Sequence, residues 1–84
     1  MYNHKVIENW QQGKRAKSFT GNLHTDGYSL YSYKLKIGYT NHNGKRIVKL
    51  YTAADGNFKS KTTSIHVNKA RVVAHGTEPA SDSM

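Results

Sequence analysis

Histidine and lysine are the side chains of this sequence that could act on a phosphodiester. Cleavage of RNA without a metal ion needs a base, an acid and a cation beside the phosphorane. His24 or His66 could serve as the base, and the partner group would come from Lys36, Arg46 or Tyr51. A structural role is favoured for both histidines. His24 flanks a turn, and His66 is expected to be a partly buried helix residue hydrogen-bonded to a strand.

Few of the residues that other enzyme classes require are present in the sequence. The sequence has no cysteine, which excludes thiol catalysis, disulfides and cysteine-ligated zinc. Its five acidic residues include no pair at a spacing typical of glycosidases. No two of its five histidines are four residues apart beside an acid, as in a helical metal site. We therefore predict a non-enzymatic protein with no metal and no cofactor, and keep a small metal-independent ribonuclease as the alternative.

Charge is distributed unevenly along the 84 residues. All 13 lysines and arginines precede residue 76, whereas only three of the five acids do, so residues 1–75 carry a formal charge of +10. Residues 76–84 carry two acids and a charge of −2. A surface this basic attracts polyanions at long range. The expected partner is single-stranded RNA or DNA, or an acidic protein surface. A merely soluble basic surface is the simpler alternative.

Basic residues near tyrosines point to binding rather than catalysis. Cations that follow a phosphate backbone, with an aromatic ring that stacks on a base, form a platform for single strands. A solvated lysine face would show the same pattern. At residues 60–64, hydroxyls and Lys61 at a helix start could hold a phosphate, although helix capping alone is favoured. The candidate binding residues are Lys14, Arg15, Lys17, Lys34, Lys36, Arg46, Lys49, Tyr51 and Lys61.

A hairpin is the element expected to hold most of these residues. Residues 28–39 alternate between apolar and polar positions, which predicts a strand with one buried face. Asn43-Gly44 predicts a two-residue type I′ turn, and residues 46–53 the partner strand. This register places Tyr39 opposite Val48. The buried positions would be Ile37, Leu35 and Tyr39, with Tyr28, Tyr31 and Tyr33 as core or rim residues. The outer face would carry Lys34, Lys36, Ile47, Lys49 and Tyr51.

Two helices and shorter strands complete the expected fold. Residues 3–12 predict a helix that buries Val6, Ile7 and Trp10, with Asn3 as its N-cap and Gly13 as its stop. Residues 63–75 predict a second helix after an N-cap at Thr62, with a β-strand as the alternative. Its apolar face would hold Ile65, His66, Ala70, Val72 and Val73. Residues 18–24 and 57–61 could add strands, the latter with Phe58 near the core.

The fold class predicted from these elements is α+β. A three- or four-stranded antiparallel meander would be packed by the C-terminal helix, with the short N-terminal helix at an edge. Residues 1–76 would form a single basic domain, and residues 77–84 a disordered polar tail. No apolar run approaches the roughly 20 residues of a membrane helix, and the N-terminus lacks the apolar stretch of a secretory signal. We therefore expect a cytoplasmic protein.

One pattern runs through Gly21-Asn22-Leu23, Thr25-Asp26-Gly27, Leu30-Tyr31-Ser32-Tyr33, Ile37 and residues 60–66. In these residues the sequence resembles small uncharacterised accessory proteins of tailed bacteriophages, and an acidic surface of a host protein complex would then be the protein partner. The resemblance implies a host machine as target: a CRISPR effector, RNA polymerase, another nuclease, or nucleic acid itself. It assigns no functional residues. The basic charge excludes mimicry of DNA, so a counter-defence or host-takeover inhibitor would occupy nucleic acid or an acidic protein patch. A structural phage component is the remaining alternative.

Overall fold

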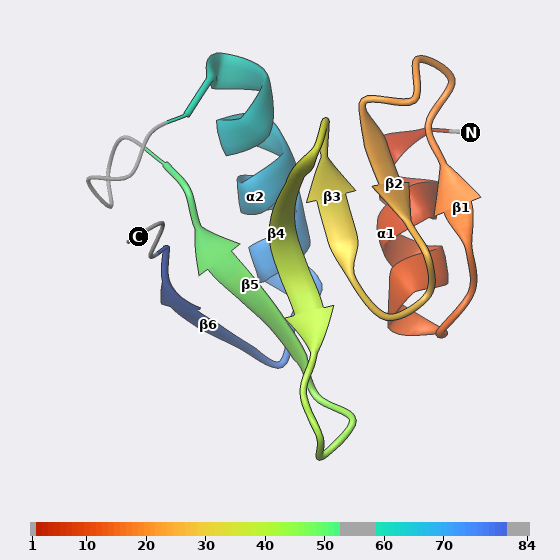
Figure 1. The fold of residues 1–84 in the computed structure, drawn as a ribbon, viewed down its shortest axis with the longest axis vertical. Coiled ribbons are helices and arrows are strands. Elements are labelled where there is room, and N and C mark those ends of the chain that lie inside the picture. The colour runs from red at the N-terminus through yellow and green to blue at the C-terminus, as the bar shows by residue number, and fades with distance from the viewer. Residues whose placement is uncertain (1, 53–58, 81–84) are drawn as a thin grey trace.

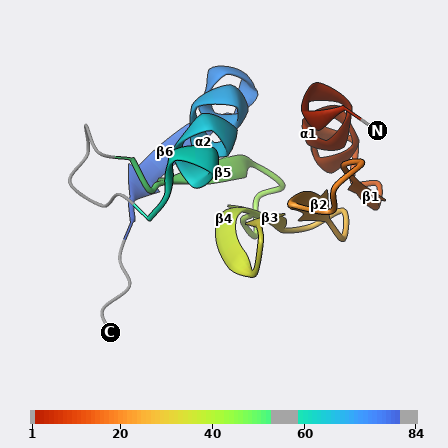
Figure 2. The same cartoon turned by 90° about the horizontal axis from the view of Figure 1, so that it is seen from above.

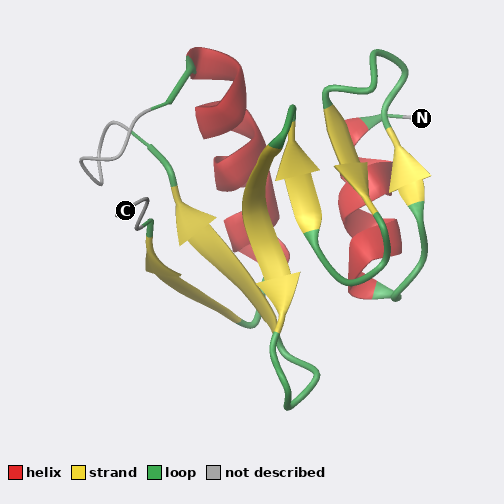
Figure 3. Ribbon diagram, viewed as in Figure 1, coloured by secondary structure: helices red, strands yellow, loops and turns green. Residues whose placement is uncertain are grey.

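Two helices cover one face of a six-stranded sheet in the computed structural model, which describes residues 2–52 and 59–80 (Figures 1 and 2). Strands β1 to β5 are neighbours in chain order and antiparallel, and β6 adds to β5 in parallel (Figure 3). The α+β class is confirmed, but the sheet has more strands than predicted and is mixed. The elements are α1 (Asn3–Gln11), β1 (Ala16–Lys17), β2 (Leu23–Thr25), β3 (Leu30–Ser32), β4 (Leu35–Thr40), β5 (Arg46–Leu50), α2 (Lys61–Val73) and β6 (Gly76–Pro79).

The prediction of a disordered tail from residue 77 is wrong for its first residues, which form strand β6. The segment Gly76–Pro79 pairs with β5 from Ile47 to Leu50, and Ala80 after it is buried. Helix α2 connects β5 to β6, as a crossover between parallel strands requires. The polar composition misled the prediction because β6 is an edge strand, where exposed polar residues and a proline are tolerated. The rest of the predicted tail, residues 81–84, lies outside the described residues.

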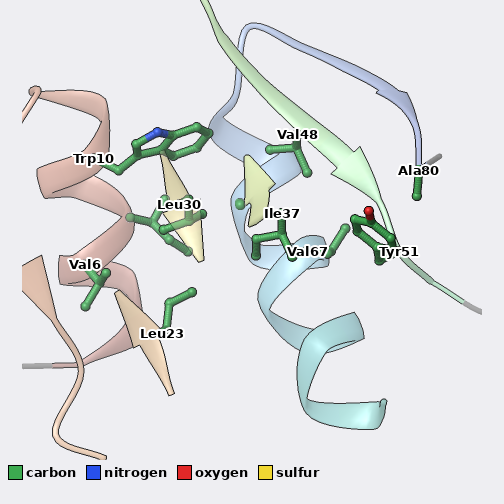
Figure 4. Packing of buried hydrophobic residues seen from close by; sticks show 11 residues of the cluster. Val6, Trp10, Leu23, Leu30, Ile37, Val48, Tyr51, Val67 and Ala80 are labelled. Carbon is green, nitrogen blue, oxygen red and sulfur yellow. The ribbon is translucent and has the colours of Figure 1, made fainter. Parts of the chain in front are cut away.

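The core lies between the sheet and both helices (Figure 4). Helix α1 buries Val6, Ile7 and Trp10, as predicted. The Trp10 indole is fully buried, and its Nε1 donates to the carbonyl oxygen of Tyr28 at 3.1 Å. It lies directly on the backbone of Gly38, where a Cβ atom would be 3.0 Å from the ring. The indole therefore ties α1 to the middle of the sheet.

Helix α2 forms where it was predicted, but with a different buried face. Thr63, His66, Val67 and Ala70 are buried. Three residues of the predicted apolar face are exposed instead: Ile65, Val72 and Val73. The pattern of apolar residues did not predict this buried face because two of its residues, Thr63 and His66, are polar. They can be buried because they form hydrogen bonds with Ser32 beneath the helix.

The register of the β4–β5 hairpin is shifted by one residue from the prediction. Gly38 pairs with Val48 and Tyr39 with Ile47. The connection is longer than a two-residue type I′ turn: the Gly44 N–H donates to the carbonyl oxygen of Asn41, and Gly44 alone takes the left-handed conformation, with φ 79°. The Asn41 Oδ1 atom accepts from the N–H groups of Asn43 and Lys45. This geometry is typical of a type I turn followed by a bulge.

Residues 28–39 form two strands rather than one. A tight turn at Tyr33 and Lys34 separates β3 from β4, and Tyr33 has a φ of 58°. The pairing between these strands jumps from Leu30–Gly38 to Tyr31–Lys36, which leaves Ile37 as an extra residue. Such a bulge interrupts the alternation of side chains. Ile37 and Gly38 are both buried, and Tyr39 is thereby placed on the same face as Lys36.

Smaller differences concern element ends. The N-cap of α1 is Tyr2 and not the predicted Asn3, and the Tyr2 side chain makes no capping hydrogen bond. At the other end, Gly13 follows the helix in a left-handed conformation, as predicted. Ser60 rather than Thr62 caps α2, since its Oγ accepts from the Thr63 N–H at 3.1 Å. The predicted strand at 18–24 is shorter and is β2. The expected Phe58, the first two residues of the strand predicted at 57–61 and Ala53 lie outside the described residues. The rest of that strand is wrong, because Lys59 and Ser60 have no regular structure and Lys61 begins α2.

Substitution of Gly27 tests the contact between the β2–β3 turn and the end of α1. Gly27 has a φ of 98°, and a Cβ atom there would lie 2.6 Å from the carbonyl oxygen of Gly13. Gly27→Ala should lower the free energy of unfolding by about 2–4 kcal/mol, from backbone strain and steric overlap. Gly21→Ala is the matched control. Gly21 has a φ of 78°, and no atom lies within 4 Å of the position of an added Cβ. Gly21→Ala should therefore lower the free energy of unfolding only by the backbone strain, about 1 kcal/mol. Equal losses in urea unfolding would contradict the packing described.

Candidate functional site

A row of four side chains crosses the sheet face that the helices leave uncovered. Strand pairing places Lys17 beside His24, His24 beside Tyr31, and Tyr31 beside Lys36. Successive residues of a strand point to opposite faces. The residues that alternate with the row in β2 and β3 are buried: Leu23, Thr25, Leu30 and Ser32. The row therefore lies on the outer face, and we call it the outer row.

The outer row has cations at its ends and aromatic rings in its middle. Neighbouring strands are about 4.8 Å apart, so Lys17 and Lys36 are about 14 Å apart across the sheet. The rings of His24 and Tyr31 stack with centroids 5.1 Å apart and an angle of 13° between their planes. The Nε2 atom of His24 lies 2.8 Å from the carbonyl oxygen of Tyr33, and it donates to that oxygen. The imidazole is thereby held in place before any ligand binds.

A hollow of about 600 Å³ lies beside the outer row at the β1 side of the sheet. Its lining includes Arg15, Lys17, His24, Asp26 and Tyr31, and is completed by Ala16, Gly21 and Thr25. Two permanent cations, two aromatic rings and one carboxylate therefore surround a single space. The sequence pattern assigned Asp26 to a turn and Tyr31 to the core or its rim, and it offered His24 only as a catalytic base.

The carboxylate of Asp26 is ionised at neutral pH. Its Oδ1 atom accepts from the N–H of Ser29 at 2.8 Å and the N–H of Tyr28 at 2.9 Å. These backbone hydrogen bonds hold the pKa of Asp26 below its usual value, and the charge of Lys36 lowers it further. The bonds also shape the turn that connects β2 to β3.

The other end of the outer face is partly neutralised by an acid. The hydroxyl of Tyr39 donates to Glu78 Oε1 at 2.6 Å, and this bond, with some burial, raises the pKa of Tyr39. Glu78 of β6 is also the register partner of Lys49. The cationic character of the outer face is therefore concentrated at Arg15, Lys17 and Lys36.

The predicted binding residues separate into groups. Arg15, Lys17 and Lys36 surround the hollow or belong to the outer row. Lys49 shares the outer face but lies beside Glu78. Lys14 and Lys34 are exposed in connecting segments. Lys61 is the first residue of α2, in the helix layer, and so is not part of the outer face.

The predicted position of Tyr51 is wrong. Tyr51 is 3% exposed and packs in the core near Ile37 and Val67 (Figure 4). Tyr31 and Tyr39, expected in the core or at its rim, occupy the outer face instead. The bulge at Ile37 turns Tyr39 outward, and the turn at Tyr33 and Lys34 does the same for Tyr31. Tyr51 is buried because β5 ends at Leu50, so the alternation of the strand does not extend to it. Gly38 within a predicted strand was the available signal, because an isolated glycine there suggests a bulge.

Arg46 serves the fold rather than an exposed surface. Its Nε donates to the carbonyl oxygen of Trp10 at 2.8 Å, and its Nη2 to that of Gln11 at 3.0 Å. A third bond runs from Nη1 to the carbonyl oxygen of Gly44 at 3.3 Å. A cation at a helix C-terminus satisfies free carbonyls and favours the helix dipole. Arg46 thus links β5 to the end of α1.

His66 lies on the opposite side of the sheet from His24. Its Nδ1 is 2.7 Å from the Oγ of Ser32, which is also 3.0 Å from the Oγ1 of Thr63. His66 is 2% exposed, and the expected hydrogen bond from a helix histidine to a strand is confirmed. Burial, with a contribution from Lys69, lowers the pKa of His66. The two histidines cannot act together on one phosphodiester.

Few charges of the described residues are neutralised by ion pairs. Within residues 2–52 and 59–80, one ion pair joins two described residues: Lys5 and Glu8 of α1, 3.7 Å apart. That pair lies in the helix layer, away from the outer row. The same residues contain no group of three or more histidines and acids that could hold a metal ion. No described helix has the length and apolarity needed to cross a membrane.

No protein-family model, curated protein or solved structure matches this chain. The resemblance to phage accessory proteins stays a prediction.

The buried His66 predicts a dependence of stability on pH. Its pKa is lower in the folded state, so the unfolded chain binds the proton more readily. The stability contributed by neutral His66 is complete above the ordinary histidine pKa of about 6.5, and is lost as the pH falls from there towards the folded pKa. His66→Gln keeps a polar partner for Ser32 without titrating. The free energy of unfolding should therefore fall more for the wild type than for this variant between about pH 7 and pH 5. Identical pH profiles would contradict the assignment.

Proposed function

We propose that the protein binds single-stranded nucleic acid on the outer face of its sheet and does not cleave it. The observation that carries the proposal is the outer row, in which Lys17 and Lys36 flank the stacked His24 and Tyr31. Lysines contact a phosphate backbone without regard to sequence, and aromatic rings stack on unpaired bases. Both kinds of contact are presented on one face.

The distribution of charge supports this proposal over a merely solvated lysine face. Residues 1–75 carry a formal charge of +10, and the outer face and the hollow hold more cations, Arg15, Lys17, Lys36 and Lys49, than acids, Asp26 and Glu78. Glu78 accepts the hydroxyl of Tyr39, and Asp26 holds the β2–β3 turn. Arg15 adds a further cation beside Lys17. A polyanion is therefore attracted to this part of the sheet.

The geometry favours binding over ribonuclease activity. Metal-free cleavage requires a base that is free to act on the phosphodiester and a second acid or cation within reach of it. His66 is buried under α2. His24 shares the outer face with Lys36, but its Nε2 proton is engaged by the carbonyl of Tyr33. The counter-defence role and the host nucleoprotein partner implied by the phage resemblance stay predictions, as does the structural phage component.

Fluorescence anisotropy with labelled single-stranded RNA and DNA over a salt series tests the proposal. The affinity should fall with rising salt, by about 0.7 decade per decade of salt for each phosphate contacted. Replacing Lys17 and Lys36 together by alanine should weaken binding at low salt and reduce this slope by about 1.4. The RNA should remain intact after incubation.

The matched control is the double variant of Lys5 and Lys69 to alanine. It removes the same charge from the helix layer, because Lys5 belongs to α1 and Lys69 to α2. Its salt slope should equal that of the wild type. Absence of binding, or equal losses in the two double variants, would contradict the outer row as the binding surface. Cleaved RNA would contradict the non-catalytic part.

A further inference from the structure

The hollow beside the outer row contains a group that a pure phosphate-binding surface would not have. The Asp26 carboxylate is ionised and shares the lining of the hollow with two cations and two aromatic rings. A carboxylate repels phosphate and can only accept hydrogen bonds. Its presence suits a ligand that brings a hydrogen-bond donor together with its phosphate.

The carboxylate has one oxygen to offer such a donor. Oδ1 accepts from the backbone N–H groups of Tyr28 and Ser29. No hydrogen bond joins Oδ2 to another residue in the described part of the chain. Because the turn orients the carboxylate through Oδ1, Oδ2 is held ready without further loss of side-chain freedom.

We propose that the hollow holds one nucleotide of the bound strand and that Asp26 accepts a hydrogen bond from that nucleotide. This inference rests on the proposed function. Arg15 and Lys17 contact the phosphate, and the rings of His24 and Tyr31 contact the base. The hollow of about 600 Å³ lies in the range of sites that hold small organic ligands, about 300–1,000 Å³.

Two parts of a nucleotide can supply the donor. One is an N–H group on the edge of the base: the amino group of cytosine, adenine or guanine, or the ring N3–H of uracil and thymine, which N3-methylation removes. The other is the ribose 2′-hydroxyl, which DNA lacks. Either donor makes the site selective, because a strand without it leaves a desolvated carboxylate unpaired. The outer row by itself would not discriminate in this way.

The test uses RNA and DNA strands of equal length with an N3-methyluridine or N3-methylthymidine background, whose bases carry no N–H donor, each carrying one variable central base. Anisotropy should show a preference of about 10-fold for strands that supply the donor. A preference for central bases that carry an N–H donor identifies the base edge as the source. A preference for RNA over DNA at every central base identifies the 2′-hydroxyl.

Asp26→Asn is the decisive variant. Asparagine keeps an oxygen for the two turn N–H groups, as in Asx turns generally, but places an amide nitrogen where Oδ2 was. The preference should fall to within about 2-fold, while overall affinity is kept or increased because a negative charge is removed. Glu8→Gln, which removes one negative charge from α1, should leave the preference unchanged.

The outcomes separate this inference from the proposed function. If the wild type binds every strand with equal affinity, or if Asp26→Asn keeps the preference, the nucleotide site is refuted and the binding platform stands. If the wild type binds no strand at all, both are refuted. Urea unfolding of Asp26→Asn confirms that the turn is intact.

Discussion

The contact between the Trp10 indole and the backbone of Gly38 determines how the rest of the molecule is arranged. Gly38 is part of the bulge in β4, and the absence of a side chain there lets the ring lie against the strand. The indole Nε1 of Trp10 donates a hydrogen bond to the carbonyl oxygen of Tyr28, and the backbone carbonyl of Trp10 accepts one from Arg46 Nε. These two hydrogen bonds hold the indole against Gly38. Helix α1 is thereby held on the same face of the sheet as α2, and the other face stays open (Figure 2).

The bulge that accommodates Trp10 also decides which side chains reach that open face. Two consecutive residues, Ile37 and Gly38, are buried under the helices. The in-and-out alternation of side chains along β4 is therefore shifted by one residue across the bulge. Lys36 and Tyr39 both face outward as a result. A regular strand would have placed one of them in the core. The packing of the core and the composition of the candidate binding surface therefore have one structural cause.

The sequence predicts the features that depend on local patterns. The buried stripe of Val6, Ile7 and Trp10 needs only helical spacing, and Gly13 ends that helix because it can adopt a positive φ. The second helix and the basic charge could also be predicted from the sequence. The register of the hairpin was not, because it depends on the length of the turn. Tyr31 faces outward because a turn divides the predicted strand, and Tyr51 is buried because β5 ends at Leu50, although Lys36 and Lys49 lie outward as expected.

Features that depend on distant contacts could not be predicted from the sequence. Strand β6 exists because β5 offers it an open edge, and nothing in its polar sequence indicates this. The polar residues under α2 are buried because Ser32, 34 residues before His66, bonds to them. The hollow joins Arg15 to Asp26 and Tyr31 from three different segments. Such combinations follow from the topology of the sheet.

The open sheet face, and not the helix layer, is the surface proposed to contact nucleic acid. A ¹⁵N–¹H NMR titration of the full chain with a short single-stranded RNA tests this. Chemical-shift changes should be concentrated at Lys17, His24, Tyr31 and Lys36, with the amides of α2 unmoved. Changes concentrated on α1 and α2, or none at saturating RNA, would contradict the proposal.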